Sequence, residues 1–383
     1  MRGNSMKVQR WFTRGVAAAL LLTMVAALSA CGDGSDDASD DATTTTAADD
    51  SGSGSEGEPA SSGPDTPAPQ PLDDTTKVTI ALAGAKGIEA YSQVLLADHF
   101  GEFEKENLEV DIQVIPLPEI VGLLQSGQVD VTPAGANIPV LNAIHSGADL
   151  RIVGAMPTFP PAPQSKAGFW VQPDLVDASG ELDPCDMKGK TVAFGGAAGF
   201  GSAASLPFAN YIEQCDLTLK DVTLSVVGGP DSLIALENGS VDAAYLPDPL
   251  WADPDQRGYA DFAIPFGEDS IGGFVMGSLR TEEPDVADAI IRALLRTTRT
   301  YLQGDYRTDP EVRPALVEVL GVDESVLDIG APLIFNPDME YDPVIVEPIQ
   351  EVWISAGDLL AYDEPIPVDD IVDETNLDRV LGG

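Results

Sequence analysis

The chain has 383 residues, of which 63 are Asp or Glu and 20 are Lys or Arg, so its formal net charge is −43. A charge of this sign repels nucleic-acid phosphates and anionic lipid headgroups, which excludes nucleic-acid binding and membrane docking through basic patches. The hydrophobic fraction of 44% is that of a globular protein, and the length predicts two domains with additional segments.

The first 31 residues have the pattern of an export signal. Four basic residues precede an apolar run at residues 15–28, which is too short to cross a bilayer. The following Leu28-Ser29-Ala30-Cys31 is similar to a bacterial lipobox, in which Cys31 is lipidated and becomes the mature N-terminus. We therefore expect residues 1–31 to be a lipoprotein signal peptide and Cys31 to anchor the protein to the outer face of the cell membrane. The alternative is an ordinary cleaved signal peptide with an unrelated cysteine.

Residues 32–75 have the composition of a linker. They contain twelve acidic residues, no basic or aromatic residue, and a single leucine, Leu72. Burial cannot offset the chain entropy of such a segment, so we expect a disordered, acidic tether.

The two remaining cysteines, Cys185 and Cys215, would share an oxidising compartment, where a disulfide is the default. A strand-like run at 191–194 and a helix-like run at 202–214 lie between them and would return both to one edge. Two buried free thiols and a catalytic cysteine remain alternatives.

From residue 76 the chain alternates between strand-like and helix-like runs. The first unit has expected strands at 77–83, 108–115, 129–133 and 150–156, with helices at 89–99, 119–125 and 138–145. Strands separated by helices predict a doubly wound, parallel-rich α/β sheet.

A second unit repeats the alternation. Its expected strands and helices lie at 191–194, 202–214, 222–226, 231–237 and 241–246. Both units contain a Gly-x-Val-Asp sequence entering a strand, at 127–130 and 239–242, which indicates two related lobes.

The expected lobe boundaries follow from these units. Lobe 1 would comprise residues 76–170 and 274–383, and lobe 2 residues 171–273, with two crossings near 169–172 and 272–276. We expect the long C-terminal helical runs at 286–302 and 348–360 to pack on lobe 1. Ligands of open α/β sheets bind beyond the carboxyl ends of the strands, here in a cleft between the lobes.

Six segments, taken in order, resemble the solute-binding proteins of ABC importers, in the branch that handles nitrate, sulfonates, taurine and thiamine-pyrimidine precursors. The first is the lipobox with its tether. The other five are ADHFGEFEKENLEVDI (97–112), LLQSGQVDV (123–131), GADLRIVGA (147–155), MKGKTVAF (187–194) and LENGSVDAAYLPDP (236–249). The resemblance implies a type 2 periplasmic-binding-protein fold. Such a protein closes around a small solute and delivers it to a membrane permease and its ATPase. We expect a monomer without a metal or cofactor.

The loop at residues 133–138 is the first candidate site. Its small residues let backbone N–H groups approach a ligand, and the family places an anion-binding or carbonyl-binding turn here. The candidate contacts are Gly135, Ala136 and Asn137. Alternatively, Asn137 only caps the next helix.

The loop at residues 195–202 joins a strand to a helix, where backbone amides and the helix dipole can hold a polar or negative group. Its candidate contacts are Gly196, Ala197, Gly199 and Ser202. The same loop fits a dinucleotide-binding pattern, but a lone match is weak evidence for a dehydrogenase. A tight turn without ligand contact is the other alternative.

The remaining candidates follow other expected strands. Asp248 could accept hydrogen bonds from an amine, while Tyr245 or Trp251 could stack on a ring; simple surface placement is the alternative. Ala85, Tyr91, Thr158 and Phe274 complete the predicted solute contacts, although an aromatic residue near a hinge is more often part of the core.

The expected solute is neutral or cationic, such as a pyrimidine or vitamin precursor. Obvious cations near the cleft loops are limited to Lys86, Arg151 and Lys166, and Asp248 would oppose an anion. A sulfonate, taurine or nitrate binder is the alternative within the family. A pyrimidine-precursor synthase of the same fold is the enzymatic alternative, but its Cys-rich iron motif is missing from this sequence, and no catalytic residue is predicted. A sensor without an importer is a third possibility.

Overall fold

The computed structural model describes residues 66–84, 86–194, 199–225, 227–266 and 272–382. The predicted signal peptide, Cys31 and most of the tether lie outside the described residues, as do Ala85, Gly196 and Ala197. Within the described ranges, every helix is too short or too polar to cross a bilayer.

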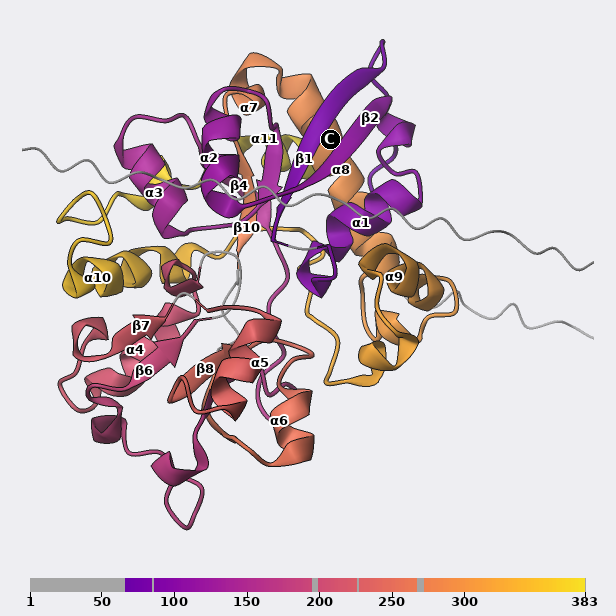
Figure 1. The fold of residues 1–383 in the computed structure, drawn as a ribbon. Helices are drawn as coiled ribbons and strands as arrows, with labels where there is room; N and C mark the ends of the chain where they lie inside the picture. Colours follow the sequence, from indigo (N-terminus) through magenta and orange to yellow (C-terminus); the bar gives the residue numbers. More distant parts are fainter. Residues whose placement is uncertain (1–65, 85, 195–198, 226, 267–271, 383) are drawn as a thin grey trace, which may run out of the picture. The chain divides into compact units, whose positions relative to one another are not determined.

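Two five-stranded sheets organise the chain (Figure 1). The first has the order β2-β1-β3-β10-β4 and the second the order β7-β6-β8-β5-β9. Their strands are β1 (Thr76–Ala83), β2 (Leu108–Ile115), β3 (Val131–Pro133), β4 (Arg151–Ala155), β5 (Gly168–Val171), β6 (Thr191–Ala193), β7 (Thr223–Ser225), β8 (Ala243–Leu246), β9 (Asp261–Pro265) and β10 (Gly273–Met276).

Strand pairing is parallel except at one strand of each sheet. β1 pairs in parallel with β2 and β3, and β6 pairs in parallel with β7 and β8. β10 in the first sheet and β5 in the second pair antiparallel with both neighbours. The predicted α/β class with two doubly wound units is confirmed, with one antiparallel strand inserted in each sheet.

Burial explains why these segments are strands. Every residue of β3, β5, β8 and β10 is buried, as expected for strands covered on both faces, and these segments are rich in Val, Phe and other apolar residues. β2 lies at the edge of its sheet and is mostly exposed, which agrees with its alternating sequence.

The helices associated with the first sheet come from both ends of the chain. They are α1 (Ser92–His99), α2 (Leu117–Gln125), α3 (Ile138–His145), α7 (Leu279–Glu282), α8 (Pro284–Tyr301), α9 (Val312–Leu320) and α11 (Thr375–Gly382). α1 packs against α8 and α9, and α11 packs against α8 and β4. The run at 286–302, which was expected to pack on lobe 1, lies almost wholly in α8 and contacts α1 and α11.

The other long C-terminal helix packs differently. α10 (Val346–Ala356) contacts α4 (Ser205–Glu213), whereas the sequence analysis placed it on the first lobe. The fully buried Trp353 explains this contact, because its indole N–H lies 3.1 Å from the carbonyl oxygen of Phe200 and 2.9 Å from Ser205 Oγ. The remaining helices are α5 (Pro230–Glu237), which packs on β8, and α6 (Ala252–Arg257).

The chain changes sheets twice. It leaves the first sheet after Ala155, enters the second at Gly168, and returns between Pro265 and Gly273. The first crossing precedes the expected position at 169–172, because residues 168–171 already pair with β8 and β9.

The end of the expected tether is ordered. The backbone N–H groups of Gln70 and Leu72 donate to Glu106, at 3.2 Å to its carboxylate and 3.1 Å to its carbonyl oxygen. Leu72 also packs on the main hydrophobic core. Glu106 is itself fully buried and paired with Arg292 and Arg296 of α8, so it presents a fixed acceptor to this segment. Residues 70–72 thus depart from the predicted disorder.

A disulfide joins Cys185 and Cys215, whose Cα atoms lie 5.3 Å apart. It links the short 3-10 helix Pro184–Met187 to the residue that follows α4 by two positions. The predicted bridge is confirmed.

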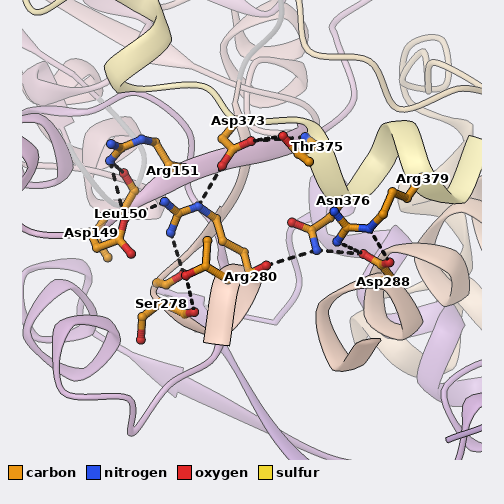
Figure 2. A network of polar contacts seen from close by, with 12 residues as sticks. Asp149, Leu150, Arg151, Ser278, Arg280, Asp288, Asp373, Thr375, Asn376 and Arg379 are labelled. Carbon is orange, nitrogen blue, oxygen red and sulfur yellow. Dashed lines mark hydrogen bonds and ion pairs between the residues drawn. The ribbon is translucent and has the colours of Figure 1, made fainter. Parts of the chain in front are cut away.

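A second polar network fixes the C-terminal helix (Figure 2). The buried Arg280 donates to Asp149 Oδ1 at 2.5 Å and to Asp373 Oδ2 at 3.1 Å. Its hydrogen bond lowers the pKa of the Asp149 carboxyl. Arg379 of α11 pairs with Asp288 of α8. Ion pairs therefore tie α11 to α8, and tie Asp373, just before α11, to Arg280.

Candidate functional site

A glycine turn follows β3 at the carboxyl edge of the first sheet. The N–H groups of Ala134 and Gly135 both donate to the carbonyl oxygen of Gly273, at 3.0 and 2.8 Å. Gly135 has φ +67°, and a Cβ added to it would lie 2.5 Å from the Cα atom of Gly272. Only glycine therefore fits this position.

Asn137 caps α3 and is 1% exposed. Its Oδ1 accepts from the Val140 N–H, and its Nδ2 donates to the Gly135 carbonyl, both at 3.0 Å. The side chain is therefore used within the turn. The backbone N–H groups of Ala136 and Asn137 make no hydrogen bond to any residue that the structure describes. They are free donors at the positive end of a helix.

The loop after β6 reaches this turn. Gly201 lies against Ile138, because a Cβ added to it would come within 3.2 to 3.4 Å of three Ile138 side-chain atoms. Gly199 begins the 3-10 helix Gly199–Gly201, and Ser202 donates its hydroxyl to the Gly199 carbonyl at 2.7 Å. The two predicted loops are thus neighbours, although they follow strands of different sheets. Nothing in the local sequence predicts the contact between Ile138 and Gly201. The same is true of the hydrogen bond from Trp353 to the Phe200 carbonyl.

Tyr245 lies on β8 within an aromatic cluster. Its ring centroid is 5.7 Å from that of Phe169 and 5.5 Å from that of Phe266. Burial, with a smaller contribution from the Asp248 charge, raises the pKa of its phenol. The hydroxyl makes no hydrogen bond within the described part of the chain.

Asp248 belongs to a separate group, which we call the Asp248 cluster: Ser165, Asp248, Trp251 and Gly330. Asp248 Oδ2 accepts from Ser165 Oγ at 3.0 Å, and its Oδ1 accepts from the Trp251 indole N–H. Burial raises the pKa of the carboxyl, and the two hydrogen bonds partly offset this. Both oxygens are therefore already hydrogen-bonded inside the protein.

Trp251 is also engaged on its ring. Lys166 Nζ lies 5.8 Å from its centroid and 5.9 Å from that of Trp170, and it pairs with Asp255 at 2.6 Å. Lys166 is thus used in internal contacts as well.

The other predicted contacts have structural partners. Tyr91 donates its hydroxyl to the Ala83 carbonyl at 2.9 Å, and burial raises its pKa to about 12, against a smaller opposing effect of that hydrogen bond. Thr158 forms a backbone bridge to Ile334. Phe274 is buried in β10 opposite Pro133. The structure does not bring these three residues into hydrogen-bonding contact with the turn after β3. In the described ranges, no group of His, Cys, Asp or Glu is arranged to hold a metal ion.

Comparison with known proteins finds one similar family and a set of similar folds. Residues 90–252 match the family model described as NMT1/THI5 like. No curated protein matches the chain significantly.

Solved structures agree on the fold. The alkanesulfonate-binding protein SsuA from Xanthomonas axonopodis pv. citri, bound to MOPS, is 22% identical with a TM-score of 0.56, over 78% of this chain and 99% of that one. The nitrate-binding protein NrtA from Synechocystis PCC 6803 is 12% identical with a TM-score of 0.60, over 82% and 90%. The aliphatic sulphonate binding protein SsuA from Escherichia coli is 19% identical with a TM-score of 0.53, over 78% and 92%.

Two of these neighbours are described as periplasmic binding proteins and the third as an alkanesulfonate-binding protein, in agreement with the fold that the resemblance implied. The described part of the chain therefore has the fold of the periplasmic binding proteins, and residues 90–252 are similar to the NMT1/THI5-like family.

Proposed function

We propose that this protein is the extracytoplasmic solute-binding component of an ABC importer. The observation that carries the proposal is the contact between the turn after β3 and the loop after β6, at Ile138 and Gly201. It brings together loops from the carboxyl ends of parallel strands in two sheets, the region where open α/β folds bind ligands. The free N–H groups of Ala136 and Asn137 lie in the same turn.

The two sheets would be the centres of two lobes that close around the solute. The first contains β1 to β4 with β10, and the second contains β5 to β9. The segment 156–167 joins them and would act as a hinge. The closed form would then deliver its solute to a permease and its ATPase.

The free groups suggest the chemistry of the solute. Backbone N–H groups at a helix N-terminus and a tyrosine hydroxyl can donate hydrogen bonds to an anion or to carbonyl oxygens. Asp248, which together with the scarcity of cations was expected to disfavour an anionic solute, has both carboxylate oxygens hydrogen-bonded to Ser165 and Trp251. A small oxyanion such as a sulfonate or nitrate is therefore our first candidate.

A pyrimidine precursor is the second candidate. Its ring would suit the aromatic surroundings of Tyr245 on β8, and its ring nitrogens could accept hydrogen bonds from the same donors.

Titration calorimetry with taurine, alkanesulfonates, nitrate and aminopyrimidines tests the assignment. We expect one class to bind, and Gly135→Ala to weaken binding at least tenfold because the turn cannot keep its shape. Gly127→Ala is the matched control, since Gly127 has φ +66° and open space at its Cβ. Turnover of any compound by the purified protein would contradict the proposal.

The membrane anchor is tested separately. We propose that Cys31 carries lipid, and we expect Cys31→Ser to release the protein from the membrane fraction. Mass spectrometry of the purified protein should show acyl chains on Cys31. A soluble, unmodified wild-type protein would contradict the anchor and leave the solute site untested.

A further inference from the structure

The Asp248 cluster joins segments that belong to different parts of the fold. Asp248 and Trp251 follow β8 of the second sheet, and Ser165 lies on the first crossing. Gly330 comes from the C-terminal part, and a Cβ added to it would lie 2.9 Å from Asp248 Oδ1 and 3.2 Å from Trp251 Cζ2. Asp248 and Trp251 of the loop after β8 therefore pack directly against the backbone of Gly330, which has no side chain to separate them.

The backbone at Gly330 is anchored to the first sheet. Arg307 is 4% exposed and donates to the carbonyl oxygens of Ile329 and Gly330, at 2.9 and 3.3 Å. The same guanidinium forms a two-point ion pair with Glu89, which lies in the segment between β1 and α1. Through Arg307, the docking point for the second sheet is tied to a loop of the first.

The first crossing shares this contact. Ser165 Oγ accepts from the Ala167 N–H at 3.0 Å while donating to Asp248, so it connects the cluster to the start of β5. Next to it, the Ala331 N–H donates to the Gln164 carbonyl, and Thr158 pairs with Ile334. A cavity lined by Pro160, Gln164, Leu302–Asp305 and Ala331–Phe335 borders the same segment. The first crossing therefore contacts the C-terminal segment through backbone hydrogen bonds and borders an open hollow in the surface.

The contact at Gly330 involves few apolar groups. It joins a carboxylate and an indole to a glycine backbone, and the small hydrophobic cluster beneath Trp251 does not include Gly330 or its neighbours. Asp248 is mostly enclosed, yet its two direct partners are neutral and the nearby Arg307 is already paired with Glu89. Burying a carboxylate without a cation of its own costs free energy that exposure to water would recover. Release of the loop would therefore recover part of this cost.

We infer that Asp248, Trp251 and Gly330 form a reversible latch between the second sheet and the C-terminal segment, which sets the balance between two arrangements of the sheets. Docked, it holds the loop after β8 against Gly330 and the first crossing. Released, it lets the second sheet turn about the first crossing. This inference rests on the proposed function, because lobe movement is what a solute-binding protein requires, but the latch contacts no solute.

Distance measurement without solute tests the latch. Spin labels at Asp111→Cys on β2 and Asp231→Cys on α5 report the separation of the sheets by double electron–electron resonance, in a full-length Cys31→Ser background. Gly330→Ala places a methyl group against Asp248 and Trp251, so we expect its distance distribution to shift or broaden by several ångströms. Gly321→Ala is the control, since Gly321 has φ +65° and nothing within 4 Å of its Cβ.

Ser165→Ala provides a milder variant, which removes one hydrogen bond to Asp248 without adding volume. We expect it to shift the distribution in the same direction as Gly330→Ala, by less. Matching distributions for Gly330→Ala and Gly321→Ala would overturn the latch. If Gly330→Ala does not fold, an unshifted Ser165→Ala distribution overturns it instead. Failure of every solute to bind, together with a shift in Gly330→Ala, would reject the proposed function and keep the latch.

Discussion

Two groups of loop residues follow strand ends in this protein, and their polar groups are used differently. In the turn after β3, the Asn137 side chain is consumed by capping, but two backbone N–H groups have no partner in the described chain. In the Asp248 cluster, both carboxylate oxygens, the indole N–H and the serine hydroxyl are all paired. Free donors suit a ligand, whereas satisfied groups suit a contact between parts of the protein.

The comparison also shows how residue type misleads. A carboxylate beside aromatic residues suggests recognition of an amine, and an asparagine in a turn of small residues suggests either a ligand contact or a helix cap. In this protein the aspartate serves internal contacts, and the small residues leave donors unpaired. Hydrogen-bond accounting separates the two cases, and residue identity does not.

The largest expected effect is at Gly135. Gly135→Ala combines a left-handed backbone with overlap on Gly272, so we expect a loss of about 4 kcal/mol in unfolding free energy. Gly127→Ala should lose only about 1 kcal/mol, because it carries the backbone cost alone. Urea denaturation of both variants measures the difference. Equal losses would show that the turn does not depend on its close approach to Gly272.

Asp248→Ala should have the next largest effect. It leaves the Trp251 N–H and the Ser165 hydroxyl without an acceptor, which we expect to cost about 2 kcal/mol. The matched control is Asp255→Ala, whose exposed pair with Lys166 should contribute less than about 1 kcal/mol. If the two variants melt alike, the cluster is not the satisfied internal contact described above.

Asn137→Ala should cost about 1 kcal/mol through loss of the α3 cap. Asn238→Ala is the control, because Asn238 is exposed and bonds only to nearby residues, so its loss should be within about 0.5 kcal/mol. Chemical denaturation gives both values. A loss as small as that of Asn238→Ala would mean that the cap does not organise the free N–H groups.

The smallest effect concerns pH. Burial raises the pKa of Asp248 in the folded protein above its unfolded value, so the folded state binds the proton more tightly. As the pH falls from 7 towards 4, wild type should gain stability relative to Asp248→Asn, by at most about 1.4 kcal/mol per pH unit. Parallel stability curves for the two proteins would show that this carboxyl is not buried as described.

Much of the fold followed from sequence patterns. The strand and helix alternation, the strand at 108–115 and the pairing of Cys185 with Cys215 depend on local periodicity and compartment, which a sequence carries directly. Glycine and small residues between a strand and a helix also drew attention to the loops at 133–138 and 195–202, and the structure describes the first of these and residues 199–202 of the second.

Other features depended on contacts between distant segments. Trp353 donates a hydrogen bond to Phe200, which lies about 150 positions earlier in the chain. Arg307 links Gly330 to Glu89. The sequence around these residues does not indicate their partners. Leu72 is a further example, because this single apolar residue of the tether packs on a hydrophobic core formed by residues far from it in the sequence. Local sequence determines which segments form strands, helices and turns, because their backbone preferences are short-range. The tertiary structure alone decided that Asp248 is an internal contact and that the α3 turn keeps its donors free, because hydrogen-bond partners are supplied by the whole fold.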